Sequence, residues 1–385
     1  MRKHGGNSEL GFLLACCAQV PETERQERML RALVTPLDWD RIVAKAELHG
    51  VIPQVYRAVA AASTTLPEIL LSAYIANCQR TLWFATELVR VTKHLQDRGI
   101  ETLAYKGPLL SEILYGSVCE RQFHDLDFIV RANDVVGAKD ALREIGYQST
   151  LALTSRQERA YLRVGYEYAM DRVQGKNLLE LHWHTQPRFY AIDFSVEDFF
   201  QRATLMELGE QPVRTLCSED LMLVLCAHAA KHLWMRLSLL ADIAQLAQCI
   251  DLNWIVIQAR AAQLGMQRIV AVCFLLAQYW LGYGMPTSVE PDEAAKSIAE
   301  EVGAILTSDA DFDMESPAYF RLMLQLRERQ YDKARFLWRL LTTPGPGEWK
   351  AVRLPDALFS LYRTVRMARL IKRCLPGSLP NKPIL

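Results

Sequence analysis

Apolar side chains recur at three- and four-residue intervals through the first part of the chain, and this spacing predicts helices. The longest series runs from Leu66 to Leu95 and is followed by Gly99, a residue type that ends helices. An earlier helix is expected after Asp38, because aspartate caps helix N-termini. We therefore expect residues 1–98 to form an N-terminal helical region.

The pattern changes in residues 99–205, where short apolar runs alternate with turn residues and helical segments. This mixture predicts a core of strands and helices. Its last two strands flank residues 174–177, a Gln-Gly-Lys-Asn sequence typical of a hairpin turn. Predicted strands cover 102–105, 123–130, 147–151, 167–171 and 178–183, and predicted helices cover 108–115, 133–145 and 155–162.

Helical spacing returns in residues 206–385, which we expect to form a C-terminal helical domain, so the predicted fold class is α+β. The segment 355–373 is basic and amphipathic. Such a helix suits a membrane surface or an acidic partner, although a terminal helix with a solvated charged face is the commoner explanation. Other helices are expected within 218–284 and over 294–305, 317–331 and 333–341.

Composition restricts the classes of protein that fit. The 44 Lys and Arg residues are balanced by 44 Asp and Glu residues, so no overall basic excess favours nucleic acid as the main partner. Nine cysteines are scattered without a C-x-x-C motif, which is typical of reduced thiols in a cytosolic protein. The N-terminus lacks the apolar segment of a signal peptide, and the longest apolar run, residues 269–277, is too short to cross a bilayer. We expect a soluble, cytoplasmic protein without a membrane span.

Two aspartates provide the first candidate chemistry. In the predicted strand 123–130, Asp125 and Asp127 project from one face, while Leu126 points into the core. Paired carboxylates repel each other unless a cation lies between them, and hard divalent cations prefer carboxylate oxygens. A polar strand end at a sheet edge is the alternative explanation.

The turn before the helix at 108–115 offers a place for phosphate. Gly107 allows the backbone to approach a ligand closely, and Pro108 suits a first helical turn. The free N–H groups of the helix N-terminus attract an anion, and Lys106 adds a positive charge. Alone, this sequence is more often an ordinary strand-to-helix turn, but the carboxylate pair on the next strand favours a phosphate site.

Further polar residues occur within apolar elements. Glu180 and His182 share a face of the last predicted strand, where a carboxylate is costly unless it is paired or binds a ligand. A solvated strand edge is the alternative. His228, Lys231 and His232 lie within about one turn of a predicted helix. A zinc site there lacks a third ligand, so the open explanations are a polar stripe facing a nucleotide and a packed helix with hydrogen-bonded histidines.

At these positions the sequence resembles the bacterial uncharacterised nucleotidyltransferase family, a branch of the polymerase-β-like nucleotidyltransferase superfamily. The resemblance covers most of the chain. It rests on Lys106-Gly107, Arg121, Asp125-x-Asp127, Leu179-Glu180-Leu181-His182-Trp183, the helical pattern of His228, His232, Trp234, Arg236 and Asp242, and Gly347-Glu348-Trp349 with the arginine-rich tail.

The resemblance implies a polymerase-β-like core with a mixed sheet, flanked by helical regions. It implies transfer of a nucleoside monophosphate from an NTP, with ATP the expected donor, to a hydroxyl or phosphate acceptor on a small molecule, peptide or protein. Asp125 and Asp127 would bind two Mg²⁺ ions, with Mn²⁺ as the alternative, together with the triphosphate. Glu180 would complete the metal shell or deprotonate the acceptor.

The same resemblance suggests which residues hold the nucleotide. Gly107 would hold phosphates, but the Gly-Ser turn of the superfamily is replaced here by Gly107-Pro108. We therefore expect Lys106 or Ser111 to make the phosphate contact. The other candidates for nucleotide or phosphate binding are Arg121, His182, His228, Lys231, His232 and Arg236.

Two other functions stay open. The displaced glycine turn is compatible with a catalytically inactive nucleotide-binding or interaction module, such as one half of a toxin–antitoxin-like pair, whereas retention of three acidic positions argues against it. A nucleic-acid-tailing enzyme would need an extended basic groove, and the balanced charge argues against that.

Overall fold

The computed structural model describes residues 8–32, 37–62, 65–173, 176–308, 312–313 and 316–374. Its first part is helical, as predicted. Asp38 caps α3, because the Arg41 N–H donates to its Oδ1 over 3.2 Å, and Gly50 ends the helix in the left-handed conformation. The helices are α1 (Ser8–Cys16), α2 (Glu22–Ala32), α3 (Trp39–His49), α4 (Ile52–Ala62) and α5 (Glu68–Asp97).

A mixed five-stranded sheet follows, with the strand order β1-β2-β5-β4-β3. Only β2 and β5 pair in parallel, and the other neighbours are antiparallel. The hairpin of β4 and β5 confirms the prediction, although Gln174 and Gly175 of its turn lie outside the described residues. The strands are β1 (Leu103–Ala104), β2 (Leu126–Ile129), β3 (Gln148–Ser149), β4 (Glu167–Val173) and β5 (Lys176–His182).

The strands differ from the prediction in two respects. The strand predicted over 123–130 begins only at Leu126, where its pairing with β5 begins, so Asp125 precedes the strand. A second, two-stranded sheet of β6 (Thr204–Leu208) and β7 (Gln211–Thr215) was not predicted. The intervening helices are α6 (Gly107–Tyr115), α7 (Val135–Glu144), α8 (Ser155–Val164) and α9 (Val196–Arg202), with short 3-10 turns η1 (Val118–Glu120) and η2 (Arg188–Tyr190).

The remaining chain is helical, as predicted, but its breaks differ. The helix expected over 317–331 ends at Gln325, because Arg329 caps the next helix and pairs with Asp332 on its first turn. The elements are α10 (Ser218–Lys231), α11 (Leu237–Cys249), α12 (Trp254–Leu264), α13 (Gln267–Leu276), the π-turn η3 (Ala277–Leu281), α14 (Glu293–Thr307), α15 (Pro317–Gln325), α16 (Gln330–Thr342), α17 (Pro346–Ala351), η4 (Asp356–Leu361) and α18 (Tyr362–Cys374).

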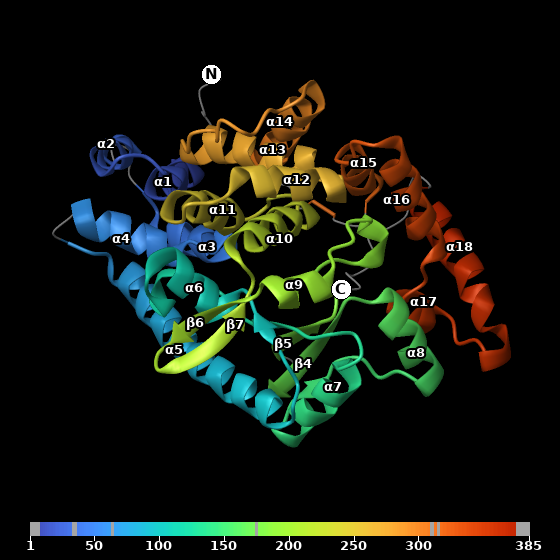
Figure 1. Cartoon of the computed structure of the whole chain (residues 1–385). Coiled ribbons are helices and arrows are strands. Elements are labelled where there is room, and N and C mark those ends of the chain that lie inside the picture. Colours follow the sequence, from blue (N-terminus) through green and yellow to red (C-terminus); the bar gives the residue numbers. More distant parts are fainter. Residues whose placement is uncertain are drawn as a thin grey trace.

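Two hydrophobic clusters lie on opposite faces of the larger sheet. Leu126 and Phe128 of β2 pack with α5 and α7 in one cluster, whereas Ile129 of the same strand belongs to the cluster that joins the N-terminal helices to α10, α11 and α13. Figure 1 shows α10 and α11 on one side of the sheet and α7 on the other. The polar side chains on the Ile129 face therefore lie between the sheet and a helical wall.

The α+β class with a mixed sheet and flanking helices is confirmed. Within the described residues, no helix is both long enough and apolar enough to cross a bilayer.

Candidate functional site

Parallel pairing of β2 and β5 brings together two carboxylates that are far apart in the sequence. Asp127 lies directly opposite Glu180 in the ladder, and His182 follows Glu180 on the same face. Lys106 lies at the junction of β1 and α6, and Glu167 of β4 lies opposite His182. These five side chains are called the acidic cluster below.

Two positive groups hold the acidic cluster together. The Lys106 Nζ donates to Asp127 Oδ1 over 2.8 Å. The His182 Nε2 lies 3.2 Å from Asp127 Oδ1 and 3.3 Å from Glu180 Oε2, and its Nδ1 lies 3.4 Å from Glu167 Oε2. Lys106, Asp127 and His182 are buried, whereas the side chain of Glu180 is 26% exposed. Glu180 is therefore the member that a molecule from solvent reaches most readily.

The surroundings shift the pKa values in opposite directions. Burial alone would raise the pKa of Asp127, but Lys106 and His182 hold it well below its ordinary value. Burial alone would lower the pKa of His182, but hydrogen bonds to Asp127 and Glu180 raise it to about 9. Asp125, which lies just outside the strand, has its pKa raised to about 7 by burial and by the charges of Asp127 and Glu180. Negative charge thus accumulates here beyond what Lys106 and His182 offset.

The acidic cluster has the donor set of a divalent cation site. One ligand atom from each of Asp127, Glu180 and His182 lies within 4.8 Å of the others. Asp127 Oδ2 is buried, and no hydrogen-bond partner for it lies among the described residues. A buried carboxylate oxygen without a partner is costly, and a hard cation would satisfy it. Asp125 is outside this group of three, so its predicted role as a metal ligand stays a prediction.

Helix α10 covers the acidic cluster. Its Lys231 donates to the Tyr166 hydroxyl over 3.0 Å, next to Glu167. The rings of His228 and His232 lie 4.6 Å apart, and burial, followed by nearby positive charges, lowers the pKa of both well below the ordinary value. Both histidines are therefore neutral and can donate and accept hydrogen bonds. Arg236 is exposed and caps α11.

The predicted phosphate turn forms the start of α6. Gly107 has φ +56°, and a Cβ atom there would lie 3.2 Å from the Asp125 carbonyl oxygen, so the turn depends on glycine. Ser111 is buried and donates to the Ser117 carbonyl over 2.7 Å. Arg121 is also buried and donates from Nε to Asp242 Oδ2 of α11 over 2.9 Å. The structure thus gives Ser111 and Arg121 internal partners, and their phosphate contacts stay predictions.

Sequence reasoning missed Glu167. It placed His182 on the same face as Glu180, as the structure does, and its predicted contact with the nucleotide stays a prediction. The hairpin prediction contained the missing signal, because folding 167–171 back onto 178–183 sets the first residue of one strand against the end of the other. The register places Glu167 opposite His182.

Comparison with known proteins identifies a family. Residues 35–282 match the model of a family described as uncharacterised nucleotidyltransferase. This range covers well over half of the chain and contains the whole acidic cluster. No curated protein and no solved structure matches the chain.

Proposed function

The chain belongs to the uncharacterised nucleotidyltransferase family, and from this premise we propose that it transfers a nucleoside monophosphate from an NTP to a hydroxyl or phosphate acceptor. The observation that carries the proposal is the acidic cluster, in which Asp127 and Glu180 face each other and Asp127 Oδ2 has no hydrogen-bond partner within the described structure. A carboxylate pair of this kind, beside a helix N-terminus, suits the chemistry of a triphosphate.

Asp127 and Glu180 are the residues that would hold a divalent cation, Mg²⁺ or Mn²⁺, with Asp125 beside them, and His182 would join them as a ligand only in its unprotonated form. Such a cation supplies positive charge that stabilises the phosphate oxygens and the departing pyrophosphate. His182 presents a ring nitrogen to both carboxylates and therefore fixes their orientation. Lys106 keeps Asp127 ionised in the buried environment.

The partly exposed Glu180 is the proposed base for the acceptor hydroxyl, because it combines exposure with a position opposite Asp127. The free N–H groups at the start of α6, at Gly107, are the proposed phosphate contact. Lys231, His228 and His232 line the opposite wall on α10 and are proposed to contact the nucleotide. ATP remains the expected donor.

The test is calorimetric titration of each NTP with and without Mg²⁺. Glu180→Gln is the main variant, because its side chain is partly exposed and the substitution leaves no buried charge unpaired. Asp127→Asn is the second, with folding checked by thermal melting. Asp140→Asn is the matched control, since Asp140 pairs with Arg143 on the exposed face of α7.

We expect Mg²⁺-dependent binding by wild type and Asp140→Asn, and at least tenfold weaker binding by a folded Asp127→Asn. Labelled nucleotide should be transferred by wild type and not by Glu180→Gln. NTP binding that depends neither on Mg²⁺ nor on Asp127 would contradict the proposal and favour an inactive binding module.

A further inference from the structure

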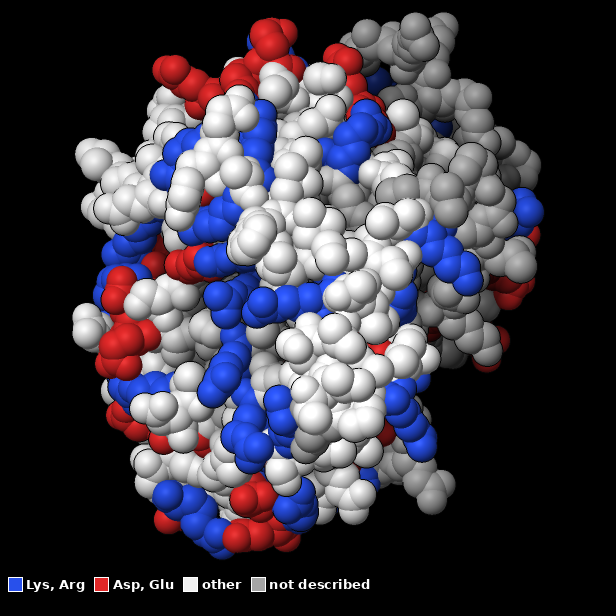
Figure 2. All heavy atoms as spheres, turned by 90° about the vertical axis from the view of Figure 1, so that its right-hand side faces the viewer, with Lys and Arg blue, Asp and Glu red and all other residues white. Residues whose placement is uncertain are grey.

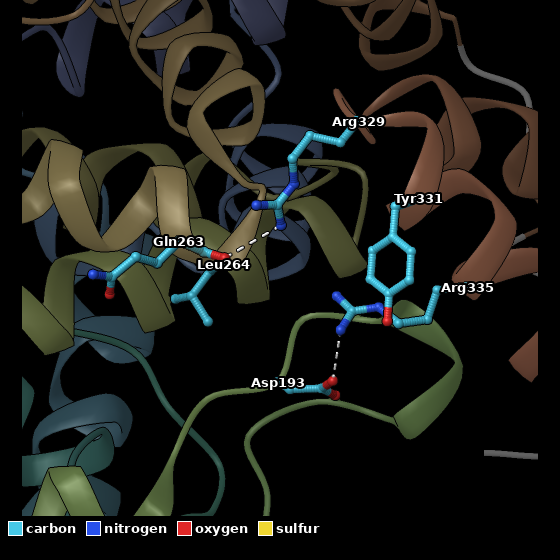
Figure 3. A pocket seen from close by; sticks show the side chains of 6 residues that line it. All are labelled: Asp193, Gln263, Leu264, Arg329, Tyr331 and Arg335. Carbon is cyan, nitrogen blue, oxygen red and sulfur yellow. Dashed lines mark hydrogen bonds and ion pairs between the residues drawn. The ribbon is translucent and has the colours of Figure 1, made fainter.

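A cavity of about 220 Å³ opens where the chain leaves β5. Its walls include Arg163, Thr185, Gln186, Arg188 and Arg339. A second cavity of about 340 Å³ adjoins it, and Asp193 lines both. Figure 3 shows Arg335 of the second cavity pointing at Asp193, with Arg329 held against the backbone of Gln263. The first cavity is called the β5-end pocket below.

The β5-end pocket contains polar groups that have no hydrogen-bond partner within the described part of the chain. Thr185 is 6% exposed and Gln186 is 4% exposed. The Thr185 Oγ1, the Gln186 Oε1 and the Gln186 Nε2 are all buried without a hydrogen bond. Buried side-chain polar atoms are nearly always paired, so three unpaired atoms on adjacent residues that line the cavity favour a ligand with both donors and acceptors.

Positive charge exceeds negative charge in the β5-end pocket. Asp193 is already shared by Arg339, over 2.6 Å, and Arg335, over 3.0 Å. Arg188 donates to the Arg163 carbonyl over 3.1 Å, and among the described residues neither of these two arginines has a carboxylate within ion-pair distance. Two guanidinium groups are thus left to bind an anion, and guanidinium recognises carboxylate and phosphate through paired hydrogen bonds.

The surface around the β5-end pocket adds to its attraction for an anion. Figure 2 shows the side of the molecule that carries α8, α16 and α18, where Lys and Arg side chains gather through the middle of the face. Arg163 ends α8, and Arg339 lies in α16. An anion approaching this face meets a positive potential before it reaches the pocket.

The β5-end pocket lies next to the acidic cluster. Thr185 follows His182 by three residues, so their Cα atoms are at most about 11 Å apart. Arg163, in the last turn of α8, precedes Glu167 at the start of β4 by four residues, and the Tyr166 carbonyl accepts from the N–H groups of Trp183 and His184. The β5-end pocket and the acidic cluster therefore lie at the same end of the β4–β5 hairpin.

We infer that the β5-end pocket binds the acceptor and that the acceptor is a small anionic molecule. Its carboxylate or phosphate group lies against Arg163 and Arg188, and its neighbouring amide or hydroxyl groups pair with Thr185 and Gln186. This inference rests on the proposed function for the transfer step, but binding of an oxyanion in the pocket does not.

The experiment measures binding of two probes, inorganic phosphate and succinate, by calorimetry with the full chain. The variants are Arg188→Gln and Gln186→Leu, with Arg163→Gln as a third that removes an exposed side chain. Arg159→Gln is the matched control, because Arg159 is exposed on the same helix as Arg163 and does not line the cavity. Comparing the two probes decides whether the oxyanion is phosphate or carboxylate.

We expect one probe to bind, and each arginine variant to weaken its binding by about 10- to 100-fold, because a charge-assisted hydrogen bond is lost. Gln186→Leu, which removes a neutral group, should weaken binding less. Arg159→Gln should bind as wild type does. Mg²⁺-dependent NTP binding should be unchanged in Arg188→Gln. When a small-molecule extract is first separated by charge, labelled nucleotide should be transferred if the anionic fraction is supplied as acceptor, but not if the neutral or cationic fraction is supplied.

The outcomes separate this inference from the proposed function. If NTP binds but neither probe does, or if Arg159→Gln weakens probe binding as much as the pocket variants do, the inferred anion site is overturned. The proposed transferase function is not affected by that outcome. Probe binding without NTP binding overturns the acceptor role together with the proposed function. Transfer to neutral or cationic fractions overturns the anionic acceptor alone.

Discussion

Replacing Arg121 by methionine should destabilise the fold far more than removing an exposed ion pair. Arg121 and Asp242 join the loop before β2 to α11, and their side chains are only 10% and 2% exposed. Burial acts against the charge of Arg121, but Asp242 outweighs it and raises the pKa of Arg121. Burial also raises the pKa of Asp242, and Arg121 offsets this only in part. Removing the guanidinium thus leaves a carboxylate in an environment that already disfavours its charge.

The magnitude follows from the 2.9 Å separation of Arg121 Nε and Asp242 Oδ2. At an effective dielectric constant of about 20, charges at that distance attract by about 6 kcal/mol. The desolvation of both groups opposes this attraction, and breaking a buried pair from one side costs about 3–5 kcal/mol. We expect the free energy of unfolding to fall by an amount in that range for Arg121→Met. The double variant Arg121→Met/Asp242→Leu should lose less, because it leaves no charge unpaired.

The assay is denaturant unfolding followed by circular dichroism. Arg143→Met is the control, because Arg143 pairs with Asp140 over a similar 3.0 Å at an exposed site. An exposed pair contributes less than about 1 kcal/mol. A loss for Arg121→Met no larger than that of the control would refute the reasoning. If the double variant is stable yet binds NTP poorly, Arg121 has the phosphate role that the sequence suggested.

Three further predictions concern glycines and one buried histidine. Gly107→Ala should cost about 1–2 kcal/mol of stability and weaken NTP binding, because φ is +56° and the Asp125 carbonyl lies 3.2 Å from the new Cβ atom; unfolding and calorimetry measure both. Gly265→Ala should destabilise more than Gly99→Ala in the same unfolding assay, since both have positive φ but only Gly265 has side-chain atoms within 4 Å of the added Cβ; equal losses would contradict this. Burial, followed by nearby positive charges, lowers the pKa of His49 to about 4 from 6.5, so the unfolded state binds more protons between those pH values. Stability should therefore fall by about 3 kcal/mol as pH drops through that window, and unfolding of His49→Gln at several pH values should lack this component.

The sequence predicted local elements well where one pattern decided them. Asp38 indicated the start of α3, and the apolar series from Leu66 to Leu95 indicated α5. The sequence did not indicate the break after Gln325, where α16 begins only at Gln330 and buries Asp332 in its first turn. Nor did it indicate that the N-terminal helices share a hydrophobic cluster with α10 and α13, since such packing joins segments that are far apart in the chain.

The candidate site shows the same division between local pattern and distant pairing. Leu179 and Leu181 are fully buried in the cluster beneath the sheet, so Glu180 between them must face the other side. Alternation in β2 likewise turns Asp127 away from Leu126. Each strand thus determines the face on which its own carboxylate lies. A register shift of one residue would turn that carboxylate toward the buried leucines. Only the parallel pairing of β2 with β5 places the two carboxylates opposite each other, and no feature within either strand specifies that partner. The facing pair of Asp127 and Glu180 is therefore the product of two local patterns and one contact that only the folded chain provides.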